Sequence, residues 1–223
     1  MSDWIPPAPL LPSAGGRLRG VLGGSALYDQ PRHAEVRARV QAFVGSGAPL
    51  AVEVGFDHGM RILDHARRWP EIHWLGLEIR KRRVAAAAPH APPNCLLWSA
   101  DARTVFSALL PPGSVSWVYI LFPTPTDNPR HLLLTPSFVS AVGRALAPDG
   151  AVYVATDVAG LATHTATLFD GWPEAPMPPM GPVLSRRERV CGRDGLPVYR
   201  LCRGKPLIED AGNGTEAAWT GQE

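Results

Sequence analysis

Short apolar runs alternate along the chain with longer segments in which apolar residues recur at helical spacing. An apolar run of about five residues is typical of a buried strand, and a recurrence every three to four residues is typical of a helix with one buried face. The runs predict strands at residues 50–54, 72–77, 94–98, 115–122 and 151–155. The periodic segments predict helices at residues 30–44, 58–68, 81–88, 102–110, 136–146 and 158–169. Since strands and helices alternate, we expect an α/β fold with a doubly wound parallel sheet and right-handed crossovers.

The last part of the chain departs from this alternation. Residues 171–182 contain too many prolines for a regular element, and residues 185–203 predict two strands around Asp194-Gly195, a β-hairpin signal. A hairpin after five strand–helix units is typical of the class I methyltransferase sheet rather than of a plain dinucleotide-binding fold. We therefore expect a seven-stranded, Rossmann-like sheet that ends in a C-terminal β-hairpin.

Composition sets the limits of this domain. The chain has 223 residues, of which 45% are hydrophobic, and this predicts one folded domain at residues 31–205. Residues 1–30 are rich in Pro and Gly and predict an irregular arm, whereas residues 206–223 predict a disordered acidic tail. The N-terminus resembles no secretory signal, and no apolar run is long enough to cross a bilayer. We therefore expect a cytoplasmic protein without a membrane partner.

Charge and cysteine content narrow the range of ligands. Residues 1–205 hold 22 basic and 16 acidic residues, a net charge of +6 that suits phosphate contacts but is no strong nucleic-acid signature. The three cysteines lie far apart without a CxxC pair, so we expect no metal site. Free thiols at Cys191 and Cys202 are expected rather than a disulfide.

Candidate ligand-binding residues follow three of the predicted strands. Gly55 and Asp57 lie in a GxDxG turn after the first strand, where glycines let a ligand approach the backbone. Glu78 ends the second strand 23 residues after Gly55, a spacing at which a carboxylate grips a ribose diol; the alternative is a solvated strand-end side chain. Asp101 follows the third strand. We expect its carboxylate to accept a hydrogen bond from an adenine amino group, to cap the following helix, or to do both. Because parallel strands end at one edge of the sheet, we expect these groups to meet there.

Several short motifs occur in an order that resembles one enzyme family: VEVGF (52–56), LGLEI (75–79), DA (101–102), LFPTP (121–125), RH (130–131) and ATD (155–157). Together they resemble the bacterial tRNA (guanine-N7)-methyltransferases, and SRRE at 185–188 is similar to that family's TxxE motif. The resemblance covers about residues 45–203. It implies a class I fold, S-adenosylmethionine (SAM) as cofactor and tRNA as methyl acceptor.

Carried over residue by residue, the resemblance implies roles for the motif side chains. The implied SAM-binding residues are Glu53, Gly55, Asp57, Glu78 and Asp101. The implied substrate-binding residues are Asn128, Asp157, Ser185 and Glu188, with Thr124 and Asp157 as the catalytic pair. Guanine N7 carries a free lone pair at neutral pH and needs no general base, so positioning and carboxylates near the cationic product suit this reaction. The alternatives are that Asp157 caps a helix beginning at Val158 and that Glu188 is a surface charge paired with Arg186 or Arg189.

The sequence also departs from the family pattern on the acceptor side. The family's FPDPW reads FPTPT at 122–126, so Thr124 replaces the acid, and Asn128 stands where a lysine is typical. Leucines at 132–134 replace a basic run and predict either core positions or a drier pocket, while Asp57 and His58 replace Gly and Met. Fewer bases mean fewer phosphate contacts. Two alternatives therefore stay open: methylation of a ring nitrogen in a small heterocycle, and a non-catalytic SAM- or RNA-binding module.

Overall fold

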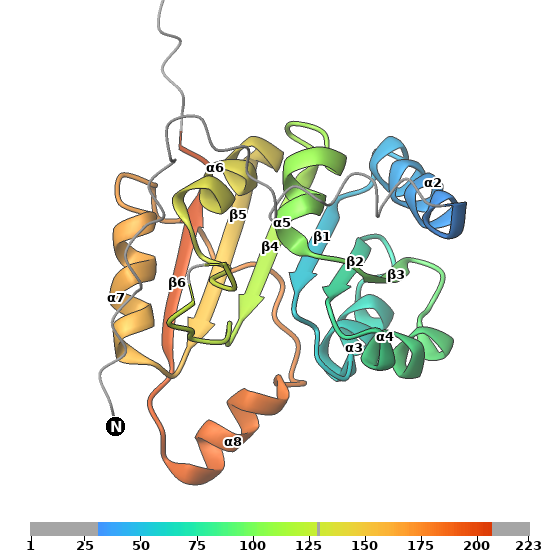
Figure 1. Cartoon of the computed structure of the whole chain (residues 1–223). Coiled ribbons are helices and arrows are strands. Elements are labelled where there is room, and N and C mark those ends of the chain that lie inside the picture. Colours follow the sequence, from blue (N-terminus) through green and yellow to red (C-terminus); the bar gives the residue numbers. More distant parts are fainter. Residues whose placement is uncertain (1–30, 129, 207–223) are drawn as a thin grey trace, which may run out of the picture.

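Six strands form a single sheet in the order β3-β2-β1-β4-β5-β6 (Figure 1). The computed structural model describes residues 31–128 and 130–206. The strands are β1 (Leu50–Val54), β2 (His73–Glu78), β3 (Cys95–Ser99), β4 (Val115–Leu121), β5 (Leu146–Thr156) and β6 (Tyr199–Gly204). The first five pair in parallel and β6 pairs antiparallel to β5. The α/β class and all five parallel strands are therefore confirmed, whereas the predicted arm and tail lie outside the described residues.

Helices connect the strands and cover both faces of the sheet. They are α2 (Pro31–Gly45), α3 (Met60–Arg68), α4 (Lys81–Ala87), α5 (Ala102–Thr104), α6 (Pro136–Ala145), α7 (Ala159–Leu168) and α8 (Arg186–Asp194). A 3₁₀ turn at Ala88–His90 extends α4, and a π-helical turn at Val105–Leu109 extends α5. The six predicted helices are all found, with ends displaced by a few residues, as is usual where helix termini fray.

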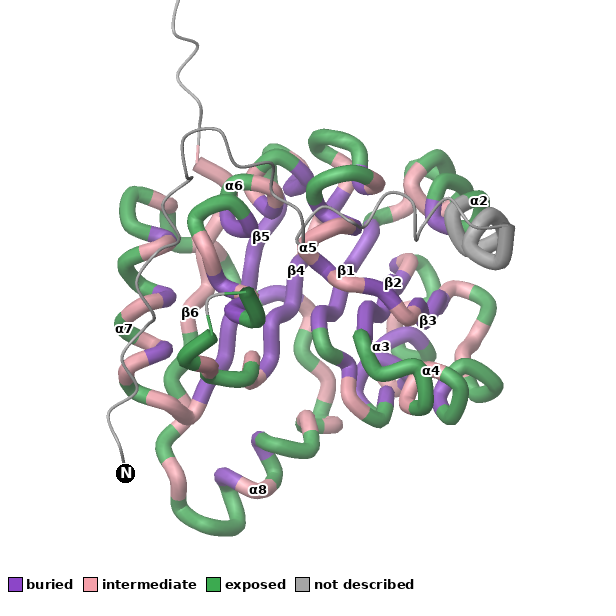
Figure 2. The backbone as a smooth tube through the Cα atoms, viewed as in Figure 1, coloured by how far each residue is buried: buried purple, intermediate pink, exposed green. Residues whose placement is uncertain are grey.

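The core consists of two apolar layers, one on each face of the sheet, with the strands buried between them (Figure 2). Successive side chains of a strand point to opposite faces, so Val118 and Ile120 of β4 join one layer while Tyr119 joins the other. Leu132 and Leu134 are buried, and Leu133 faces the pocket described below. Both alternatives for this leucine run are therefore realised, at different residues.

The predicted C-terminal hairpin is wrong, because residues 185–203 form helix α8 followed by the single strand β6. Ser185 caps the helix, its hydroxyl accepting a hydrogen bond from the Glu188 backbone N–H at 3.2 Å. Gly195 ends the helix with φ +64°, and the Leu196 N–H donates to the Cys191 carbonyl. Asp194-Gly195 is thus a helix C-terminal signal, since glycine in the left-handed region serves helix ends as well as hairpin turns.

The count of seven strands is also wrong for the described residues, which form six. Glu174 makes one isolated antiparallel bridge to Arg203 beyond β6, but no strand develops there. Proline lacks the backbone N–H that a sheet ladder needs, and residues 173–182 contain five prolines. Among the described helices, none has the length and apolar character required to span a bilayer.

Candidate active site

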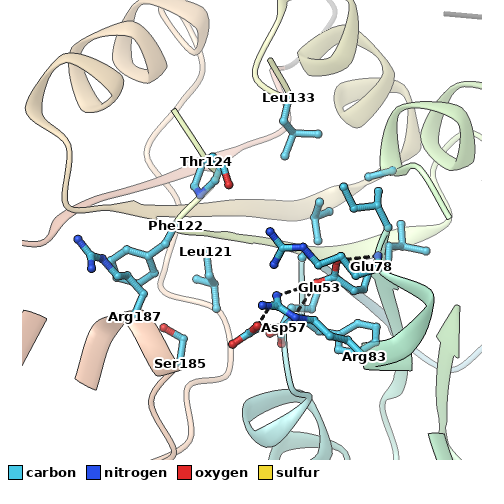
Figure 3. Close-up of a pocket in the computed structure, with 18 of the residues that line it drawn as sticks. Glu53, Asp57, Glu78, Arg83, Leu121, Phe122, Thr124, Leu133, Ser185 and Arg187 are labelled. Carbon is cyan, nitrogen blue, oxygen red and sulfur yellow. Dashed lines mark hydrogen bonds and ion pairs between the residues drawn. The ribbon is translucent and has the colours of Figure 1, made fainter. Parts of the chain in front are cut away.

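A cavity of about 900 Å³ opens at the carboxyl ends of the parallel strands and is also lined by the first residues of α8. This helix lies below the strand ends in Figure 1. Figure 3 shows Glu53, Asp57, Glu78 and Arg83 on one side of this pocket. Ser185 and Arg187 lie on the other side, with Phe122 and Thr124 at the end of β4. Parallel sheets place ligand sites at this edge, so the location matches the prediction.

The turn after β1 forms the floor of the pocket. The Gly55 N–H donates to the Leu77 carbonyl at 2.7 Å, and Gly55 has φ +75°. A Cβ on Gly55 would meet nothing within 4 Å, so the backbone conformation, rather than space, requires glycine. Asp57 also has a positive φ, +54°, and its carboxylate pairs with the guanidinium of Arg83. A strained conformation at a non-glycine residue is typical of functional sites.

Glu78 faces this turn from the end of β2. Its Oε2 accepts a hydrogen bond from the Asp57 N–H at 3.2 Å, and its Oε1 accepts one from the Arg80 N–H at 3.0 Å. An Arg83 Nη1 lies 3.6 Å from the same carboxylate. The alternative of a solvated strand-end side chain is wrong, since Glu78 is only 5% exposed. Its role toward a ribose stays a prediction.

Asp101 caps the helix after β3 and also lines the pocket. Its Oδ1 accepts from the Arg103 N–H at 2.9 Å, and its Oδ2 lies 2.6 Å from Arg103 Nη2. Burial favours the neutral acid, but the hydrogen bonds from Arg103 outweigh it, so the pKa of Asp101 lies below its usual value. Arg103 also donates to the Arg130 carbonyl at 2.6 Å, which ties the loop after β4 to this wall.

A buried ion pair forms part of the pocket lining. Arg61 Nη1 of α3 donates to Glu53 Oε2 of β1 at 2.8 Å, and both side chains are 3% exposed. Burial raises the pKa of Glu53, and the guanidinium of Arg61 opposes that shift. Sequence reasoning missed Arg61. The signal that could have indicated a buried arginine was its position directly before Ile62, on the face of α3 that packs against the sheet.

Asp157, directly after β5, also lines the pocket. Its Oδ2 accepts from Arg187 Nε at 3.1 Å and from Nη2 at 2.5 Å, and the hydrogen bond raises the pKa of Arg187. The alternative of a helix cap is wrong, because Val158 occupies the cap position of α7 without any side-chain hydrogen bond. Arg187 lines the pocket, which sequence reasoning did not foresee.

Two predicted substrate residues, Glu188 and Asn128, lie outside the described lining of the pocket. The Glu188 Oε1 pairs with Arg200 Nη2 at 2.7 Å, rather than with Arg186 or Arg189. The Asn128 Oδ1 accepts a hydrogen bond from the Arg130 N–H at 3.0 Å. Thr124, Ser185 and Asp157 do line the pocket, so only some of the residues predicted for the acceptor come together there, and their role stays a prediction.

Each carboxylate that lines the pocket is paired with an arginine. The pairs are Glu53–Arg61, Asp57–Arg83, Glu78–Arg83, Asp101–Arg103 and Asp157–Arg187. By contrast, Arg186 has no carboxylate within ion-pair distance among the described residues, and its Nη1 lies 3.5 Å from His58 Nε2. Arg80 also lines the pocket without an ion-paired carboxylate in the described part of the chain, so the five acids and six arginines of the lining nearly balance one another. Within the same ranges, no three His, Cys, Asp or Glu side chains are grouped to hold a metal ion.

Comparison with known proteins now identifies the family. The model of the family described as "Putative methyltransferase" matches residues 47–176. The tRNA (guanine-N(7)-)-methyltransferase of Chromohalobacter salexigens is 30% identical over 165 residues, which is 70% of this chain and 67% of the relative. The chain belongs to the tRNA (guanine-N7)-methyltransferase family. A second member of this family, from Leifsonia xyli subsp. xyli, is 36% identical over 141 residues, covering 60% of this chain and 62% of the relative. The chain spans about three fifths to two thirds of the length of these relatives.

Solved structures share the fold of this family member. The 16S rRNA methyltransferase KamB superposes with a TM-score of 0.55, 19% identity, and coverage of 76% of this chain and 93% of that one. The 16S rRNA (adenine(1408)-N(1))-methyltransferase from Catenulisporales acidiphilia gives 0.53, with the same identity and coverage. At this identity the likeness concerns the fold alone. The class I methyltransferase fold expected from the sequence is confirmed.

Proposed function

We propose that this protein transfers the methyl group of SAM to N7 of a guanine in tRNA. The observation that carries the proposal is the pocket at the strand ends, which Glu78, Asp101 and Asp157 line together. The relatives are named for this reaction, which supports tRNA as the acceptor. The cytoplasmic location expected from the sequence stays a prediction.

The pocket residues fit the cofactor. A volume of about 900 Å³ lies in the range of small-molecule sites. Glu78 is held there by hydrogen bonds from the Asp57 N–H of the glycine turn and from the Arg80 N–H after β2. In this proposal Glu78 binds the ribose hydroxyls of SAM, and Asp101 accepts a hydrogen bond from the adenine amino group. Glu53, Gly55 and Asp57 lie beside the rest of the cofactor. The bound cofactor supplies the electrophilic methyl group.

The acceptor side needs positioning groups rather than a base. Asp157 accepts hydrogen bonds from the guanidinium of Arg187, and the N1–H and amino group of a guanine present donors of the same kind. The acceptor therefore displaces Arg187 from Asp157. Thr124 offers a hydroxyl at the end of β4 but no negative charge, so Asp157 is the acid that stabilises the positive charge developing on the purine.

The first prediction tests Asp157. Asp157→Asn keeps the shape but removes the charge, so methyl transfer to tRNA should fall by about tenfold to hundredfold, as when one group that stabilises transition-state charge is lost. The affinity for S-adenosylhomocysteine should stay within about twofold. Asp194→Asn is the matched control, because Asp194 pairs with Arg193 at the far end of α8, outside the pocket. Equal rates for the wild type and Asp157→Asn would place the acceptor site elsewhere.

The second prediction tests tRNA through its phosphates. Arg186 and Arg189 of α8 carry no ion pair among the described residues, unlike Arg187, so they are free to contact a backbone. We expect log affinity for tRNA to fall linearly with log salt, by about 0.7–0.9 per phosphate neutralised. The double variant Arg186→Glu/Arg189→Glu should flatten this slope by about 1.5.

Arg193→Glu is the control for that experiment, since Arg193 lies on the same helix but pairs with Asp194. It should change the slope much less than the double variant. A wild-type slope near zero, with no label entering tRNA from labelled SAM, would contradict the tRNA assignment. That result would favour a small heterocycle if a small acceptor is labelled, and a non-catalytic binding module if none is.

A further inference from the structure

The segment between α7 and α8 runs behind the strands of the sheet in Figure 1 before it reaches the start of α8. It is rich in proline and forms no strand, so it lacks the ladder of backbone hydrogen bonds that fixes the strands. Helix α8 begins five residues after Gly181, and its cap Ser185 lines the pocket together with Arg186 and Arg187. The position of these residues therefore depends on what holds the segment.

Three consecutive residues of the segment, Pro179, Met180 and Gly181, are held by side chains of the sheet and α3. The Tyr119 hydroxyl of β4 donates to the Pro179 carbonyl at 2.8 Å. Arg61 Nη2 contacts the Met180 sulfur at 3.4 Å. The Gly181 N–H donates to His65 Nε2 at 3.0 Å. Each contact comes from a different side chain, so the segment is fixed along three successive residues.

The contacting side chains are themselves immobilised. His65 is 0% exposed, and its Nδ1 donates to the Arg61 carbonyl at 2.9 Å, which leaves Nε2 as the acceptor for Gly181. Burial and the nearby Arg61 lower the pKa of His65 to about 4, so the ring is neutral at pH 7. The Arg61 guanidinium lies 4.3 Å from the centroid of the Tyr119 ring, a cation–π contact.

The fit at Gly181 is close. A Cβ on Gly181 would lie 3.0 Å from His65 Cε1 and 3.1 Å from Asp64 Oδ2, so a side chain there would push the segment away from α3. Arg61 also holds Glu53 in the pocket floor, so the same guanidinium contacts both the floor and the segment that leads to α8.

We propose that His65, together with Arg61 and Tyr119, is a positioning site that sets the start of α8 over the pocket and thereby supports acceptor binding. None of these three residues is assigned such a role by the family motifs. The inference rests on the proposed function in one respect: Ser185 and Arg187 are taken to lie on the acceptor side. The positioning itself is a property of the free protein and can be measured without any acceptor.

Two substitutions of His65 separate its two nitrogens. The amide oxygen of Gln reaches the place of Nε2, so His65→Gln keeps an acceptor for the Gly181 N–H. The amide of Asn reaches only the place of Nδ1, so His65→Asn keeps the donor to the Arg61 carbonyl and loses Gly181. Both variants replace a neutral ring by a neutral amide, which makes each the control for the other. Tyr119→Phe removes only the hydroxyl that donates to the Pro179 carbonyl. This variant replaces His65→Asn in the experiment if His65→Asn does not fold.

Hydrogen exchange of the full chain is the first measurement. Amides of residues 181–190 should exchange about tenfold faster in His65→Asn than in the wild type, and His65→Gln should restore most of the protection. Tyr119→Phe should show a smaller increase over the same residues. Equal exchange in the two His65 variants, or no increase in folded His65→Asn and Tyr119→Phe, would overturn the proposal.

Ligand measurements then locate the effect. In His65→Asn the KM for tRNA should rise about tenfold while the affinity for S-adenosylhomocysteine stays within about twofold, and His65→Gln should recover the KM. A loss of cofactor affinity equal to the loss for tRNA would mean general disruption and would overturn the positioning role. If no tRNA is methylated by the wild type, the proposed function fails, whereas the exchange result still decides the positioning site.

Discussion

Replacing Glu53 by alanine should lower the free energy of unfolding by about 3–5 kcal/mol, because Arg61 would then be left as an unpaired charge in the core. Both side chains are almost fully buried, and the 2.8 Å contact joins β1 to α3 in the pocket lining. Denaturant unfolding without cofactor measures this change directly, since no ligand contributes to the result. Loss of one partner of a buried pair costs more than loss of both.

The double variant Glu53→Gln/Arg61→Met is the control, and it should recover most of the lost stability. Arg61→Met alone leaves a buried acid whose pKa burial raises above its usual value. A folded-state pKa above the unfolded value gives stability that is present at low pH and lost as the pH rises, so this variant should lose stability as the pH rises through the folded-state pKa of Glu53. If Glu53→Ala unfolds at the wild-type denaturant concentration, the buried pair does not stabilise the fold.

Removal of the Glu78 carboxylate should weaken binding of S-adenosylhomocysteine by about 1–3 kcal/mol, or about fivefold to 150-fold, the range for charge-assisted hydrogen bonds. The carboxylate faces the glycine turn from β2 and is oriented by two backbone N–H donors. Calorimetric titration of Glu78→Ala measures this loss. Because those donors also lose their acceptor, the thermal stability of the free variant must be compared with that of the wild type.

An analogue that lacks the ribose hydroxyls separates the direct contact from disturbance of the loop. The wild type should bind the 2′,3′-dideoxy analogue of S-adenosylhomocysteine more weakly than the parent compound, whereas Glu78→Ala should bind both about equally. If the variant still discriminates between the two ligands as the wild type does, Glu78 is not the ribose-binding residue. Glu174→Ala, which removes a carboxylate 90% exposed beyond β6, is the control for charge alone.

The parallel part of the fold could be predicted from the sequence because each buried strand is a nearly unbroken apolar run. β1 was predicted with its observed limits, and the carboxylates at the strand ends met in one pocket because topology places those ends together. Residues 185–203 could not be predicted this way. The Asp194-Gly195 pair suits a hairpin and a helix end equally, and the choice depends on Ser185 capping α8 and on β6 pairing with β5.

The arginines of the pocket were the larger omission. The spacing of carboxylates from the glycine turn identifies candidate ligand-binding acids. It does not show which arginine side chain forms an ion pair with which acid. Arg187 had no role in the sequence-based assignment, yet it pairs with Asp157 across 30 residues of chain. Such pairs are formed by side chains that the sheet brings together, so they require the structure.

The pairing of every acid in the pocket with an arginine has a consequence for what the pocket attracts. A cleft with bare carboxylates would concentrate magnesium ions and polyamines, which accompany RNA wherever it is bound. Here arginines of the protein already neutralise those acids, so a ligand binds by replacing an arginine at a carboxylate rather than by displacing a bound cation. Selectivity in such a cleft depends on the match of hydrogen-bond donors and acceptors. Removal of one of these arginines would leave a bare carboxylate, which would then attract small cations.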